Sequence, residues 1–154
     1  MNKKISAGLL MYRLNDITLE VFLVHPGGPY YTRKDSGAWS IPKGEIEGQE
    51  DLLGTAIREF AEETRITPTG NFLALGSVKQ KGGKIVFAWA FKVDYQQTPA
   101  IKSNKFELEW PPRSGKMQKF PEIDRAEFFP IETAKIKINN AQFAFIERLE
   151  SNLG

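Results

Sequence analysis

The sequence of 154 residues has no cysteine and a single histidine, His25. Without cysteine the chain forms no disulfide, no thiolate zinc site and no cysteine nucleophile. A Ser-His-Asp triad or a multi-histidine metal site would have to be built around His25 alone. His25 stands at the end of an expected strand, and we interpret it as a structural residue. The chemistry of the chain must therefore be sought among its carboxylates and basic side chains.

Long apolar runs and a strong excess of one charge are also missing. No apolar run approaches the roughly 20 residues that a membrane-spanning helix needs. The 21 basic and 19 acidic residues give a net charge of +2, so no global field points to nucleic acid or to an anionic membrane. With 41% hydrophobic residues, the chain is long enough for one well-buried core. We expect a single cytoplasmic domain over residues 1–154 with a small-molecule substrate, no membrane partner and no preference for nucleic acid. The oligomeric state stays open.

The pattern of apolar residues predicts a mixture of strands and helices. Strands are expected in a hairpin over 5–13 and 18–25, in a second hairpin with a Gly-Gly turn, and over 128–131. The second hairpin covers 72–80 and 85–93. Helices are expected over 49–64, where apolar residues recur at i, i+3 and i+4, and over 141–149. Strands interleaved with two helices predict an α+β fold, with a mixed sheet packed between helices as an α/β/α sandwich.

Three carboxylates crowd the end of the first expected helix, in the run REFAEET. Glu59, Glu62 and Glu63 fall within an arc of about 100°. The pair at i, i+4 repels by a few tenths of a kcal/mol, and each acid near the helix end opposes the dipole by roughly 0.3 to 1 kcal/mol. Mg²⁺, which takes carboxylate and phosphate oxygens as ligands, would offset this repulsion. The alternative is that Arg58 and Arg65 neutralise the acids on a solvated face.

The residues before the helix favour a ligand site over a merely solvated face. Gly44 and Gly48 bracket a turn in which the backbone can approach a ligand closely. Glu50 stands at the helix start, where a carboxylate suits the unpaired amides. A glycine-bracketed loop that leads directly into a helix lined with acids is a more specific arrangement than the acids alone.

The stretch GEIEGQEDLLGTAIREFAEETRI, residues 44–66, resembles the Nudix box. Eight of its nine defining positions match, and these are Gly44, Glu50, Arg58, Glu59, Phe60, Glu62, Glu63 and Ile66. At the ninth, Arg65 stands where the family has glycine. A side chain with a Cβ adopts a left-handed helix cap less readily, at a cost of about 1 kcal/mol. The preceding WSIPKG, residues 39–44, faintly resembles the dinucleoside polyphosphate hydrolase branch.

The resemblance implies the Nudix fold and hydrolysis of a nucleoside diphosphate linked to another group, with Mg²⁺ or Mn²⁺ as cofactor. Glu62 and Glu63 would bind the metal, together with a backbone carbonyl at Lys43 or Gly44. Glu59 would bind metal or act as general base on the attacking water.

Two supporting roles and one additional ligand also follow from the resemblance. Arg58 would orient a glutamate bidentately, and Glu50 would brace the loop against the helix. Some family members take a further acid from a later loop. Of the candidates Glu122, Asp124 and Glu127, we favour Glu122 as a metal ligand, beside the alternative of a solvated acid before a strand.

The substrate contacts are less determined by the sequence. Lys43, Lys79, Lys81 and Arg33 are candidates for phosphate contacts, and Tyr31 for stacking on a base, although an ordinary surface role suits each of them alone. Nucleoside triphosphates, dinucleoside polyphosphates and a diphosphoinositol phosphate are the substrates considered. A non-catalytic nucleotide sensor of the same fold and an RNA-end pyrophosphohydrolase are the alternative functions. The sensor would tolerate loss of the acids, and the RNA-end enzyme would need a basic groove.

Overall fold

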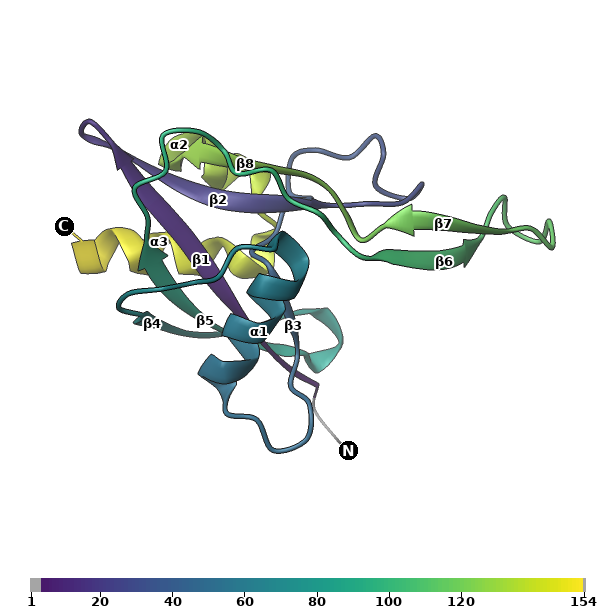
Figure 1. The fold of residues 1–154 in the computed structure, drawn as a ribbon, viewed down its shortest axis with the longest axis horizontal. Coiled ribbons are helices and arrows are strands. Elements are labelled where there is room, and N and C mark those ends of the chain that lie inside the picture. The colour runs from purple at the N-terminus through teal and green to yellow at the C-terminus, as the bar shows by residue number, and fades with distance from the viewer. Residues whose placement is uncertain (1–3, 154) are drawn as a thin grey trace.

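The computed structural model describes residues 4–153 and is built around a mixed β-sheet. The strand order is β4-β5-β1-β2-β8, and β3 pairs with β1 beside this path (Figure 1). The strands are β1 (Ile5–Asn15), β2 (Thr18–Pro26), β3 (Lys43–Glu45), β4 (Leu73–Lys79), β5 (Ile85–Lys92) and β8 (Ile123–Pro130). Strand β1 runs parallel to β5 and antiparallel to β2 and β3, so it is the centre of the sheet.

Helices cover both faces of this sheet. Helix α1 (Leu52–Thr64) lies on one face, and α2 (Ile131–Lys137) and α3 (Phe143–Leu153) lie on the other. Along β1 the side chains alternate: Leu9 and Met11 pack with the α1 side, whereas Leu10 packs with the side of α2 and α3. Burial of each such side chain contributes about 1.5–3 kcal/mol. The predicted sheet between helices is confirmed.

Helix α2 and the start of strand β8 depart from the sequence prediction. Residues 131–137 form a helix that was not expected, and β8 begins at Ile123, five residues before the predicted strand. The segment IETAKIK is only two turns long and carries β-branched residues that suit a strand equally well. Its buried Ile131 and Ala134 follow helical spacing, and Ile136 is left exposed. A segment this short takes its structure from packing rather than from its own propensity.

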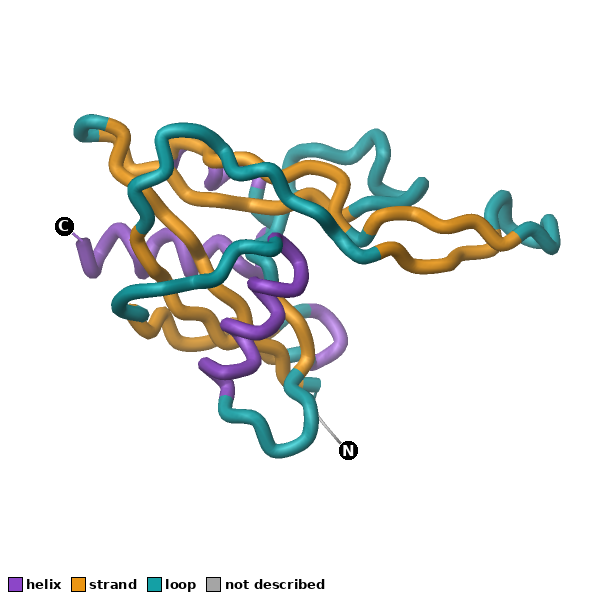
Figure 2. Tube along the Cα trace, viewed as in Figure 1, coloured by secondary structure: helices purple, strands orange, loops and turns teal. Residues whose placement is uncertain are grey.

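A separate hairpin projects from the body of the molecule. It consists of β6 (Lys105–Glu109) and the unexpected β7 (Met117–Pro121), and it forms the long arm in Figures 1 and 2. The loop that follows β2 packs along this hairpin. The Tyr30 ring meets the Trp110 ring, at the turn end of β6, edge to face with centroids 5.3 Å apart. Nearer the base of the hairpin, a Cβ on Gly28 would collide with Phe106. The arm is therefore anchored to the loop of 26–38.

Helix α1 begins and ends with identifiable caps. The Asp51 carboxylate accepts a hydrogen bond from the Gly54 N–H, which starts the helix at Leu52 rather than at residue 49. At the other end Arg65 adopts the left-handed conformation, with φ 64° and ψ 17°, and its N–H bonds the Ala61 carbonyl. Its guanidinium binds the Asn104 side chain, at 3.2 Å. Arg65 thus takes the backbone conformation expected of glycine.

No helix among residues 4–153 has both the length and the apolar character needed to cross a bilayer.

The strain at position 65 predicts the ranking of two substitutions. Arg65→Gly and Arg65→Ala both lose the bond to Asn104, but only glycine adopts the left-handed conformation without a steric penalty. We expect the glycine variant to be about 1 kcal/mol more stable than the alanine variant, measured by urea unfolding. Equal stabilities, or a more stable alanine variant, would show that residue 65 is not left-handed in solution.

Candidate functional site

Arg58 joins the loop before α1 to the carboxylates on the helix. Its Nε and Nη2 donate to the two oxygens of Glu50, at 2.8 and 2.9 Å, so this pair is bidentate. Its Nη1 donates to Glu59 at 2.9 Å and reaches a Glu62 oxygen at 3.4 Å. The hydrogen bonds from Arg58 lower the pKa of Glu50 to about 2. The structure therefore places Glu50 where it ties the loop to the helix.

Glu59 lies against the backbone of β3. A Cβ on Gly44 would collide with the Glu59 carboxylate, so only glycine at this position leaves room for it. Burial raises the pKa of Glu59, and the hydrogen bond from Arg58 acts in the opposite direction. The first glycine of the box and its central glutamate are therefore in direct contact.

Glu63 is the most strongly perturbed of the three acids. Burial, followed by the charges of Glu59 and Glu122, raises the pKa of Glu63 to about 8, whereas the ammonium and the backbone N–H of Lys43 pull it down. Glu122, on the link between β7 and β8, is therefore brought near the carboxylates of α1. Glu62 is half exposed and its partner is Arg58.

The other two acids of the later segment lie elsewhere. Asp124 binds the ring of His25, and Glu127 lies exposed on β8. Among the three acids weighed from the sequence, the structure thus brings the favoured one, Glu122, toward Glu63.

The acids suit a hard divalent cation. Within residues 4–153 no three acidic or histidine side chains are already gathered closely enough to enclose an ion. After burial, the charges of Glu59 and Glu122 nevertheless both contribute to the raised pKa of Glu63. Carboxylate oxygens are the ligands that Mg²⁺ prefers, and a cation would relieve this repulsion. The residues present therefore fit such an ion.

A cavity of about 780 Å³ opens beside these acids. Its walls come from three separate parts of the chain: residues 26–40, the β4–β5 turn, and residues 139–141. Lys43 of β3 also lines it, and Lys43 is the link to the acids because its ammonium interacts with Glu63. Burial lowers the pKa of Lys43, although Glu63 opposes this effect.

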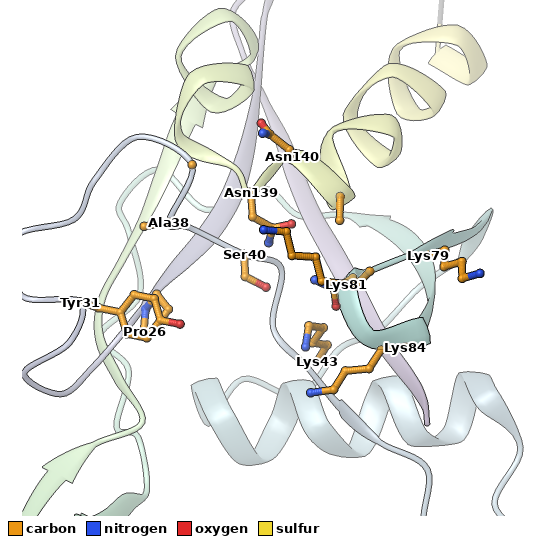
Figure 3. Close-up of a pocket in the computed structure, with 13 residues that line it drawn as sticks. Pro26, Tyr31, Ala38, Ser40, Lys43, Lys79, Lys81, Lys84, Asn139 and Asn140 are labelled. Carbon is orange, nitrogen blue, oxygen red and sulfur yellow. The ribbon is translucent and has the colours of Figure 1, made fainter. Parts of the chain in front are cut away.

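Most of the predicted substrate residues meet at this cavity. Tyr31, Lys43, Lys79 and Lys81 line it, whereas Arg33, on the same loop as Tyr31, does not and is exposed. Figure 3 shows Lys43 and Lys81 directed into the cavity, with the Lys79 side chain directed away from them. Tyr31 lies across from the lysines.

Lys84, Asn139 and Asn140 line the cavity and were not among the predicted substrate contacts. Lys84 reaches the cavity beside Lys43 (Figure 3), and the Gly-Gly turn between it and Lys81 is a signal that would have found it. Asn139 and Asn140 carry no such signal. They reach the cavity because Asn139 caps a short 3-10 turn over Asn140–Gln142, far from the box in sequence.

Solved structures with the same fold share little sequence with the chain. A Caenorhabditis elegans Ap4A hydrolase in a binary complex aligns with a TM-score of 0.70 at 20% identity, covering 96% of this chain and 97% of that chain. The NUDIX domain of Shewanella oneidensis NrtR complexed with ADP ribose gives 0.70 at 17%, covering 100% and 90%. The MutT protein from Methanosarcina mazei Go1 gives 0.63 at 21%, covering 99% and 98%. No curated protein matches the chain.

A family model decides the assignment. The NUDIX domain model matches residues 3–149, a range that contains the box, the cavity walls and Glu122. This match confirms the family expected from residues 44–66 and the prediction of a Nudix-type hydrolase. The chain belongs to the NUDIX domain family.

Proposed function

We propose that the protein is a Mg²⁺-dependent pyrophosphohydrolase that cleaves a phosphoanhydride bond in a nucleoside diphosphate linked to another group. The position of Lys43 carries this proposal. Lys43 lies between the buried carboxylate of Glu63 and a cavity that three further lysines line. At about 780 Å³, the cavity falls within the range of roughly 300–1,000 Å³ typical of small-molecule sites. The carboxylates that would bind a metal cation thus lie next to the lysines that would bind the phosphates.

The carboxylates have distinct duties in this proposal. Glu62, Glu63 and Glu122 supply oxygen ligands, with the Gly44 carbonyl as a further one. Mg²⁺ held there would lower the pKa of a bound water and neutralise charge on phosphate oxygens. Glu59 binds the metal or accepts the proton of the attacking water, and Arg58 holds its carboxylate in place.

The cavity binds the remainder of the substrate. Lys43, Lys81 and Lys84 meet the phosphate oxygens, and Tyr31 stacks on a base at the opposite wall. Several lysines around one cavity favour a substrate with several phosphates, of the nucleoside triphosphate or dinucleoside polyphosphate type. The structural likeness to an Ap4A hydrolase and to a domain bound to ADP ribose supports a nucleotide of this kind.

Removing one carboxylate at a time tests the catalytic assignment. We expect the wild type to release phosphate from a panel of nucleoside triphosphates and dinucleoside polyphosphates with Mg²⁺ or Mn²⁺. Glu59→Gln, Glu62→Gln and Glu63→Gln are each expected to reduce kcat by about 10²-fold or more. Glu132→Gln, at an exposed position of α2, is the matched control and is expected to leave kcat unchanged.

Two outcomes would contradict the proposal in different ways. A wild type that binds nucleotides tightly and cleaves none of them is a nucleotide sensor. If the wild type and the glutamine variants cleave equally well, the acids do not take part in the reaction.

Glu63→Gln is expected to lower the activity but to raise the stability of the metal-free protein, because the pKa of Glu63 is raised. Its folded-state pKa of about 8 lies above the ordinary value of 4.5, so above pH 4.5 the folded state binds more protons than the unfolded state. Stability therefore falls as the pH rises from about 4.5 to 8. In EDTA, we expect Glu63→Gln to melt at a higher temperature than the wild type at pH 8 and at the same temperature near pH 4.5.

Adding Mg²⁺ at pH 8 should reverse this order, because only the wild type retains the ligand and gains stability from binding. Glu62→Gln, at the more exposed acid, serves as the control and should show a much smaller pH effect in EDTA. A Glu63→Gln variant whose difference from the wild type is the same at both pH values would refute the buried carboxylate.

A further inference from the structure

One wall of the cavity is an exposed loop without regular secondary structure. The segment 26–38 contributes Pro26, Tyr31, Gly37 and Ala38 to the lining, and residues 30–37 are exposed to solvent. Loops of this kind are more mobile than the elements that they connect. The position of Tyr31 therefore depends on what ties the middle of the loop to the body of the protein.

The buried His25, at the end of β2, holds the middle of the loop. Its Nε2 lies 2.7 Å from the carbonyl oxygen of Lys34, in the middle of the loop. The Lys34 N–H donates to the Tyr31 carbonyl at 3.0 Å, and the Lys34 ammonium lies over the Tyr31 ring, 5.4 Å from its centroid. His25 is thus two hydrogen bonds away from the aromatic residue of the cavity wall.

The second ring nitrogen of His25 also faces an oxygen atom. Nδ1 lies 2.7 Å from Oδ1 of Asp124 on β8, whose side chain is 32% exposed. A carbonyl oxygen only accepts hydrogen bonds, and so does an ionised carboxylate. The bond to Lys34 therefore needs a proton on Nε2, and the bond to Asp124 needs a proton on Nδ1.

Several charged groups belong to the elements that pack around His25. The fully buried Trp39 ring packs against His25 with centroids 5.2 Å apart, and its Nε1 donates to Asp35 of the loop. The Arg125 guanidinium also lies over the Trp39 ring, 5.2 Å from its centroid. The charged groups around His25 are Asp124 and Arg125 from β8, Lys34 and Asp35 from the loop, and Lys137 from α2, which pairs with Asp35.

We propose that His25 is a positioning residue of the substrate cavity. Through its Nε2 proton it ties the loop that carries Tyr31 to the end of β2, and it therefore sets substrate affinity and leaves the rate of the chemical step unchanged. The kinetic part of this inference rests on the proposed hydrolase function, whereas the tie itself can be measured without any substrate.

The single histidine gives the proposal a direct spectroscopic readout. Only one imidazole contributes to the ring ¹⁵N spectrum of the labelled protein, so its protonation is assigned without ambiguity. The wild type is expected to show a proton on Nε2, the nitrogen that faces the Lys34 carbonyl. A wild type whose Nε2 carries no proton would overturn the proposal.

Kinetics separate positioning from catalysis. With a substrate that the wild type hydrolyses, His25→Leu is expected to raise KM about threefold to tenfold, the loss of about one hydrogen bond, with kcat within twofold of the wild type. His25→Gln, whose side-chain amide can also donate to the Lys34 carbonyl, is expected to restore most of the lost affinity. Ser36→Ala, at an exposed position of the same loop, is the control and should change neither KM nor kcat. An unchanged KM, or a loss confined to kcat, would refute the positioning role.

Limited trypsin digestion tests the tie when no substrate is available. The loop carries two cleavage sites, after Arg33 and after Lys34, and both are exposed. Cleavage there is expected to be several-fold faster in His25→Leu than in the wild type, in Ser36→Ala and in His25→Gln, under urea-free conditions in which circular dichroism shows each variant to be folded. Equal cleavage rates would overturn the tie. If the wild type hydrolyses nothing, the proposed function fails, and the spectrum and the digestion still decide the role of His25.

Discussion

The guanidinium of Arg58 is the interaction on which the box region depends. It binds Glu50, Glu59 and Glu62, three acids that would otherwise repel one another. Its bidentate bond to Glu50 fixes the loop of 44–51 against α1. Its bond to Glu59 holds that carboxylate against Gly44 of β3. A planar fork with five donors suits this task, and the single ammonium of a lysine does not.

Arg58 also divides the acids into two groups. Glu50 and Glu62 lie on its side and have a cationic partner, whereas Glu63 is buried beyond it and depends on Lys43. The raised pKa of Glu63 is the consequence of this division. A chain selected for stability alone would not half-bury a carboxylate near two others. The cost of doing so in the folded protein is the physical argument for the proposed cation site, since proteins commonly accept such costs at functional sites.

Much of this site was visible in the sequence because its signals are local. The box places Glu59, Glu62 and Glu63 on one helix, and helical spacing alone predicts that they share one edge of it. The supporting roles of Arg58 and Glu50 were expected from the resemblance and not from the spacing. The lysines of the β4–β5 turn follow from a hairpin with a Gly-Gly signal. Asn139 and Asn140 reach the same cavity from a distant part of the sequence. No local sequence pattern predicts such a contact, because it depends on how the whole chain folds.

The same distinction explains the fold. Long elements with strong periodicity, such as α1 and the first hairpin, were predicted to within a few residues. Helix α2 and strand β7 are short, and each is held by a partner rather than by its own sequence: α2 by the sheet through Ile131 and Ala134, and β7 by β6. His25 was expected to be structural from its place at a strand end. The oxygen atoms that it joins, on Lys34 and Asp124, come from opposite parts of the chain.

Arg65 shows what the glycine of the box encodes. The helix ends with a left-handed residue whether or not that residue is glycine, and the chain retains the geometry while using the side chain to hold Asn104. A signature written in residue letters misses one position here, whereas one written in dihedral angles misses none. Relatives that have drifted further in sequence would be recognised more surely by the sign of φ at this residue than by the residue itself.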